Sequence, residues 1–131
     1  MIPKFRAWLK KEQKMDNYID HISWLEDELY CIGDGITYMV SAEDLVLMQS
    51  TGLKDKNGKE IFEGDILDYR GRKALVRWHG SYASFIYRFV DELQNRNTEW
   101  KPLYLAYMKC EIIGNIYENP ELLEDIKCTQ K

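Results

Sequence analysis

The sequence predicts a mainly β fold, a small barrel-like or strongly twisted antiparallel sheet followed by a short C-terminal helix. Runs of β-branched and aromatic residues of strand length recur at close spacing, with glycine, asparagine and aspartate between them. Helical periodicity is scarce. The chain has 131 residues, 45% of them hydrophobic, with four Trp, nine Tyr and four Phe. This length supports one core, so we expect a single domain over 1–131.

The N-terminal part alternates short apolar stretches with turn residues. We expect strands over 5–9, 18–24, 29–32, 36–40 and 45–50. Gly33-Asp34-Gly35 predicts a hairpin, because glycine accepts the positive φ that the loop needs. Ser41 and Asp44 have the spacing of a capping box, but too little follows to sustain a helix, so we expect a turn there.

The middle of the chain carries the strongest hairpin signal. Asn57-Gly58 is the preferred pair for a type I′ turn, and Arg70-Gly71-Arg72 predicts another turn. We expect strands over 66–69, 74–78 and 82–90, with a turn at 79–81.

The C-terminal part predicts two more strands and the helix. Residues 91–102 are polar, so we expect an exposed connection. Strands are expected over 103–108 and 110–117. Asn119 can cap a helix that has Pro120 in its first turn, and we expect the tail 127–131 to be disordered.

Charge is distributed unevenly, although the net charge is only −4. Residues 1–14 hold five bases and one acid, residues 15–45 hold eight acids and neither Lys nor Arg, and residues 70–90 hold five bases and no acid. Segments of opposite sign attract each other within a domain or between copies of it. We therefore expect a homo-oligomer.

Cysteine and histidine do not form a metal-binding pattern. The spacings of structural zinc sites are absent among Cys31, Cys110, Cys128, His21 and His79. An odd number of cysteines without close pairs favours a reducing compartment. No apolar run approaches a membrane span, and the N-terminus lacks the apolar segment of a secretion signal. We expect a cytoplasmic protein with no metal and no membrane association.

No arrangement typical of an enzyme stands out. The chain has no Gly-x-Ser-x-Gly motif, and Gly33-Asp34-Gly35 lacks the third glycine and the helix of a dinucleotide fingerprint. Glu63, Asp65 and His79 are the acid–base candidates of a hydrolase, but each also suits a structural role at a turn. We expect no catalytic residue, no cofactor and no enzymatic activity.

The segment 70–90 supports an alternative, a single-stranded nucleic-acid-binding small β-barrel. Its basic and aromatic side chains could hold phosphates and stack bases, as single-strand binders do. The candidate residues are Arg70, Arg72, Lys73, Arg77, Trp78 and Arg88. Two observations oppose this interpretation. The sequence pI is near 5.2, and strand alternation puts Phe85, Tyr87 and Phe89 on the side opposite Arg88.

Three blocks, Pro3–Trp8, Leu47–Ile66 and Ile113–Leu123, resemble in order and spacing the YopX family of small proteins from bacteriophages and prophages. The resemblance covers nearly the whole chain except residues 91–102. It implies a β-rich fold, a phage or prophage origin and residence in the cytoplasm of a bacterial host. It supplies no catalytic residue, substrate or cofactor.

These observations together predict a phage or prophage accessory protein that acts as a non-enzymatic binding or assembly module. We expect it to self-associate through exposed strand edges and complementary charge. A phage or host protein is the other partner that this interpretation allows, and nucleic acid is the partner in the alternative. Whether 91–102 is a binding loop is left open.

Overall fold

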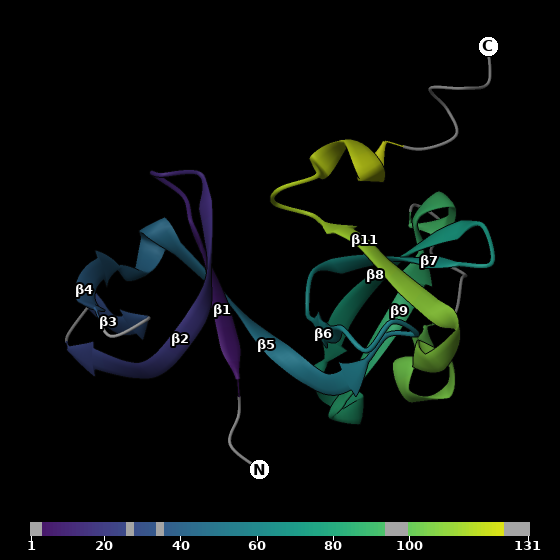
Figure 1. Cartoon of the computed structure of the whole chain (residues 1–131), viewed down its shortest axis with the longest axis horizontal. Helices are drawn as coiled ribbons and strands as arrows, with labels where there is room; N and C mark the ends of the chain where they lie inside the picture. The colour runs from purple at the N-terminus through teal and green to yellow at the C-terminus, as the bar shows by residue number, and fades with distance from the viewer. Residues whose placement is uncertain (1–3, 26–27, 34–35, 94–99, 125–131) are drawn as a thin grey trace. The chain divides into compact units, whose positions relative to one another are not determined.

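A computed structural model describes residues 4–25, 28–33, 36–93 and 100–124. The chain forms two compact units, Met1–Ser50 and Thr51–Lys131 (Figure 1). Strands dominate both, and each helical segment described is a 3₁₀ turn of three or four residues, which confirms the mainly β fold. The single domain over 1–131 stays a prediction, and the tail 127–131 lies outside the described residues.

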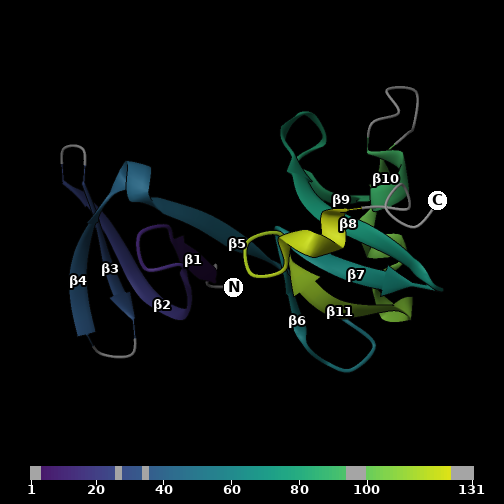
Figure 2. The ribbon, with the colours of Figure 1, turned by 90° about the horizontal axis from the view of Figure 1, so that it is seen from above.

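The first unit is an antiparallel meander whose last strand returns beside the first (Figure 2). The sheet order is β4-β3-β2-β1-β5, and β5 continues into the second unit, where β6 is its neighbour. The strands are β1 (Phe5–Leu9), β2 (Lys14–Leu25), β3 (Glu28–Gly33), β4 (Ile36–Ser41) and β5 (Leu45–Lys54). The predicted hairpin is confirmed by the antiparallel pairing of β3 with β4, in which Gly33 lies opposite Ile36, while its loop residues 34–35 lie outside the described residues.

The sheet of the first unit bends because its ladders contain register shifts. One lies opposite β1 between Phe5 and Ala7, and another lies in the β2–β3 ladder between Ile19 and His21. Such bulges increase the local twist of a sheet. After β4, the 3₁₀ turn η1 (Ala42–Asp44) leads directly into β5, which confirms the expected turn.

The second unit contains a five-stranded antiparallel sheet in the order β10-β9-β8-β7-β11. Its strands are β7 (Asp65–Tyr69), β8 (Arg72–His79), β9 (Ser84–Phe89), β10 (Lys101–Pro102) and β11 (Cys110–Asn115). The short β6 (Glu60–Phe62) precedes them. The 3₁₀ turns are η2 (Gly80–Tyr82), η3 (Val90–Glu92), η4 (Leu103–Leu105), η5 (Tyr107–Lys109) and η6 (Pro120–Leu123).

One face of this sheet forms the core of the second unit. Ala74 lies opposite Phe89 and Val76 opposite Tyr87, so these four side chains point to the same side. Leu67, Leu103 and Cys110 complete the buried cluster. The aromatic side chains of β9 therefore serve the core, as strand alternation predicts.

The two predicted hairpins of this unit have different turns. Arg70 and Gly71 both have positive φ, 54° and 89°, as a two-residue type I′ turn requires. The type I′ prediction for Asn57-Gly58 is wrong, because only Gly58 has a positive φ. The Gly58 N–H donates to the Asp55 carbonyl at 2.9 Å, which fits a type I turn followed by a left-handed glycine.

The predicted strand over 103–108 is also wrong. These residues form the 3₁₀ turns η4 and η5. Leu103 and Ala106 are buried, whereas Leu105 is exposed. The apolar residues thus reach the core with a period of three, which suits a 3₁₀ turn and not a strand.

The C-terminal helix is present only as the 3₁₀ turn η6, and Asn119 does not cap it with its side chain. Instead, the Asn119 Oδ1 accepts the backbone N–H of Asn115 at 3.2 Å. The Asn115 Oδ1 accepts the N–H groups of Tyr117 and Glu118. The strand predicted over 110–117 therefore ends at Asn115. There, side-chain oxygens accept the backbone N–H groups in place of carbonyls from a neighbouring strand.

We predict that Gly114→Ala lowers the free energy of unfolding by about 2 kcal/mol, because overpacking forces neighbours to move. A Cβ at Gly114 would lie 2.6 Å from Asn119 Oδ1 and 2.8 Å from Leu122 Cδ1. Moving Asn119 would break its bond to Asn115. Urea unfolding measures the effect. Gly80→Ala is the control, since its Cβ would come no closer than 4.0 Å to Trp78, and equal losses in both variants would contradict the prediction.

Candidate functional site

The structure separates the six residues of the predicted nucleic-acid site. Arg70 lies in the β7–β8 turn. Strand alternation puts Arg72 and Trp78 on the core side of the sheet. It puts Lys73, Arg77 and Arg88 on the opposite side. The segment 70–90 therefore does not present one continuous basic surface.

Arg72 is already neutralised within the chain. Its Nη2 lies 2.8 Å from Asp91 Oδ1 and 3.2 Å from Glu92 Oε2. Its guanidinium also lies over the Phe89 ring, 3.6 Å from the centroid. The hydrogen bond to Asp91, followed by that to Glu92, raises the pKa of Arg72 despite partial burial. Its charge is therefore compensated before any ligand arrives.

Trp78 is held by a ring contact on the core side. Its ring centroid is 5.0 Å from that of Phe85 in an edge-to-face arrangement, and the side chain is still partly exposed. Trp78 therefore cannot act together with Arg77 or Arg88, which point to the other side of the same strands.

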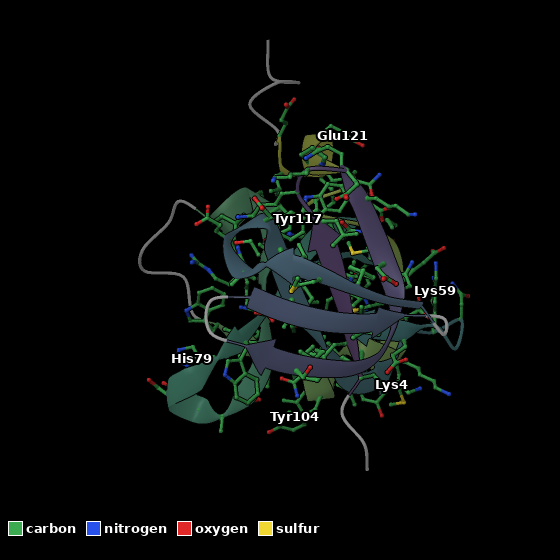
Figure 3. The ribbon with its side chains drawn as sticks, turned by 90° about the vertical axis from the view of Figure 1, so that its left-hand side faces the viewer. Lys4, Lys59, His79, Tyr104, Tyr117 and Glu121 are labelled. Carbon is green, nitrogen blue, oxygen red and sulfur yellow. The ribbon has the colours of Figure 1, made fainter. Side chains whose placement is uncertain are left out.

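The opposite side brings together a different group, which we call the stacking cluster. It consists of Arg77, His79, Tyr82, Arg88 and Trp100. The His79 and Tyr82 rings stack with centroids 4.4 Å apart, and Trp100 meets His79 edge to face at 6.3 Å. The Arg88 guanidinium lies 4.5 Å from the Trp100 centroid. Figure 3 shows His79 at the β8–η2 end of the second unit.

Sequence reasoning found only part of this cluster. Tyr82 belongs to the basic segment, but the strand predicted over 82–90 begins only at Ser84, and Tyr82 lies in the turn η2. Trp100 precedes β10, in which Lys101 pairs with Tyr87 of β9. Only this pairing brings Trp100 beside Arg88, and no local pattern in residues 91–102 announces it.

The acid–base candidates have structural partners. Asp65 is buried, and its Oδ2 accepts the backbone N–H of Phe62 at 2.8 Å. Gly64 donates its N–H to the Val76 carbonyl and accepts from Ile116. His79 lies at the C-terminal end of β8, and its ring stacks on that of Tyr82. The turn role expected of Asp65 thus matches its contacts, and the absence of enzymatic activity stays a prediction.

Asp55 is a buried polar residue that sequence reasoning passed over. Its Oδ1 accepts the N–H groups of Asn57 and Lys59, and its Oδ2 accepts that of Ile112, each at 2.9 Å. Burial raises the pKa of Asp55, but these bonds outweigh it and leave the pKa below 3.8. The sequence signal for this role is an Asp three residues before a Gly, because that spacing favours a type I turn that begins at the Asp.

Cys110 is the cysteine whose side chain the structure describes, and it is a free thiol. Cys110 is buried, and its Sγ donates to the Ala106 carbonyl at 3.3 Å. Burial raises the pKa of the Cys110 thiol to about 11. The side chains of Cys31 and His21 and the whole of Cys128 lie outside the described residues. Among those that are described, no group of three His, Cys, Asp or Glu residues could hold a metal ion.

The comparisons with known proteins settle the family. The model of the family described as YopX protein matches residues 4–124. The chain belongs to the YopX family. It also resembles the crystal structure of protein EF1440 from Enterococcus faecalis, with a TM-score of 0.62 and 29% sequence identity, over 94% of this chain and 99% of that one. No curated protein matches the chain significantly.

In two of the three sequence blocks of this YopX protein, polar residues are explained by local structure. In the middle block, Asp55 and Asp65 satisfy backbone N–H groups, and in the last block Asn115 and Asn119 do the same. None of the described helices is long and apolar enough to cross a membrane.

We predict that Asp55→Asn destabilises the protein at neutral pH by about 2–3 kcal/mol, because one amide oxygen cannot replace both carboxylate oxygens as acceptors. The pKa of Asp55 is lower in the folded protein than in the unfolded chain, so the ionised carboxylate stabilises the fold. This stabilisation is fully present above the pKa of the unfolded chain and is lost as the pH falls through the pKa of the folded protein. The difference in unfolding free energy between wild type and Asp55→Asn should therefore shrink below about pH 3.8.

Urea unfolding at a series of pH values measures this difference. The exposed Glu121→Gln is the matched control and should change stability by less than about 0.5 kcal/mol at every pH. A loss in Asp55→Asn that is the same in acid and at neutral pH would show that the charge of Asp55 is irrelevant.

Proposed function

We propose that the protein is a non-enzymatic binding and assembly module that pairs with a second copy of itself through the outer edge of β4. The single observation that carries this proposal is that β4 is the one long, uncharged sheet edge among the described strands. A phage or host protein partner and residence in the bacterial cytoplasm stay predictions from the family resemblance.

The other sheet ends are short or covered. β6 has three residues and β10 has two. The edge of β11 is occupied, since the Cys110 carbonyl accepts the Lys56 N–H and the Ile112 N–H donates to Asp55. Unpaired strand edges invite pairing with another chain, and short or covered edges prevent it.

β4 lacks the features that block an edge. It has six residues, Ile36–Ser41, without Lys, Arg, Asp, Glu or Pro. Its only strand neighbour in the described sheet is β3. Natural proteins protect such edges with charges, prolines or bulges, and an unprotected one is a site of association.

Side chains on one face of β4 hold the strand in place. The Tyr38 hydroxyl donates to Asp16 Oδ2 at 2.6 Å, across the intervening strand β3. Val40, on the same side, packs against the apolar cluster of the first unit. Met39 points the other way and is 52% exposed. Because side chains on one face fix β4 in place, the backbone groups along its outer edge are held in position to pair with another strand.

Pairing of β4 with β4 of a second copy gives a closed, two-fold symmetric dimer, because an antiparallel strand pair is self-complementary. Residues 1–50 hold five bases and nine acids, so the two apposed units repel each other. Some of the bases are paired internally, as in Lys11–Asp44 at 3.4 Å. Salt therefore screens net repulsion in this dimer, and we expect it to strengthen association.

We predict that Met39→Lys converts the dimer to a monomer, because a charge on a sheet edge opposes strand pairing. Light scattering should give a mass near twice 15.6 kDa for the wild type and near 15.6 kDa for the variant. The wild-type dimer should gain stability between about 50 and 500 mM salt.

Met108→Lys is the matched control, because Met108 is 69% exposed in η5 of the second unit and should leave the dimer intact. A wild type that is monomeric at all salt concentrations, or a Met39→Lys variant that remains dimeric, would refute pairing through β4.

A further inference from the structure

We propose that the stacking cluster of the second unit binds single-stranded nucleic acid, with bases stacked on Tyr82 and Trp100 and phosphates held by Arg77 and Arg88. This binding is separate from assembly through β4. It replaces the six residues that the sequence suggested with a set that shares one side of the sheet.

The acid excess of the chain does not oppose anion binding at this place. Residues 51–131 hold thirteen bases and thirteen acids, so the negative net charge belongs to residues 1–50. Within the second unit, the first two carboxylates that follow Arg88 in the sequence, Asp91 and Glu92, are directed to Arg72. Glu99, the neighbour of Trp100 in the sequence, lies outside the described residues. The low pI therefore gives little information about the local field at the cluster.

Two aromatic rings are held where bases can reach them. Tyr82 is 71% exposed, although its ring stacks on His79, with 21° between the ring planes. Trp100 is 37% exposed, and the Arg88 guanidinium lies over its ring. Each ring is therefore fixed by a polar neighbour instead of being buried in a core. Fixed exposed rings are what single-strand binders use as stacking platforms.

Cationic groups lie beside these rings. Arg77 is exposed and, among the residues that the structure describes, makes no salt bridge. It lies on the same strand and the same side as His79, two residues away. The Arg88 Nη2 donates to the Glu92 carbonyl at 2.9 Å, and its guanidinium lies over the Trp100 ring. The cluster thus combines π surfaces with positive charge.

This combination favours single strands over a duplex. Bases inside a duplex are already stacked on one another and do not offer their faces to Tyr82 or Trp100. Bases of a single strand do, and any base can stack, so we expect little sequence preference. The ligand expected at the stacking cluster is therefore a polyanion that carries exposed planar groups.

The experiment is a fluorescence-anisotropy titration of the full chain with a labelled oligodeoxythymidylate of about 15 nucleotides, which fits one small β-domain. Affinity should fall about sevenfold between about 50 and 200 mM salt, since two phosphate contacts release about 1.4 counterions from a single strand. A duplex of the same length should bind more weakly than the single strand.

Four variants test the residues of the stacking cluster. Trp100→Ala and Tyr82→Ala should each weaken binding about tenfold, the lower part of the range for one stacked base. Trp100→Phe should restore most of the affinity lost in Trp100→Ala. Arg77→Glu should weaken binding and reduce its salt dependence, because one phosphate contact is lost. Thermal unfolding of each variant establishes that it is folded.

Tyr104→Ala is the matched control, because Tyr104 is 61% exposed in η4 but lies outside the stacking cluster. It should bind as the wild type does. The proposal is overturned if the wild type does not bind the oligonucleotide at about 50 mM salt. It is equally overturned if the folded cluster variants bind as tightly as wild type, or if Tyr104→Ala loses as much affinity as they do.

Discussion

The second unit depends on one buried carboxylate. Asp55 accepts two N–H groups from its own turn and one from Ile112, which is 57 residues further along the chain. The local bonds shape the β5–β6 turn, and the distant bond fastens it to β11. Because an ionised acceptor forms stronger hydrogen bonds than a neutral one, three such bonds offset the cost of its burial. The contact with Ile112 also covers part of the outer edge of β11.

The sequence was most informative where structure is local. The turns at 33–35 and 70–71 follow from glycine beside strand-forming residues, and the structure confirms both hairpins. Prediction failed where side-chain hydrogen bonds or burial decide the backbone conformation. Asn57-Gly58 has the composition of a type I′ turn, but Asp55 holds it in another form. Residues 103–108 have strand-forming side chains, yet burial of Leu103 and Ala106 imposes 3₁₀ turns.

The candidate site shows why a count of charges along the sequence misleads. Arg72 and Arg77 look alike in the sequence, but one is paired with Asp91 and Glu92 while the other is exposed. Trp78 lies among the basic residues in the sequence and points to the side opposite Arg77 and Arg88. Trp100 belongs to a segment without any basic pattern and reaches the cluster through the pairing of β10 with β9. Only the sheet register assigns these side chains to one side or the other.

The thiol of Cys110 gives the second unit a built-in reporter. It is 1% exposed, bonded to Ala106, and almost fully protonated at neutral pH because its pKa is about 11. Thiolates react with alkylating reagents and buried thiols do not, so Cys110 reacts only when β11 moves away from the core of the second unit. In a variant without Cys31 and Cys128, the alkylation rate would report how often the last strand of the sheet detaches.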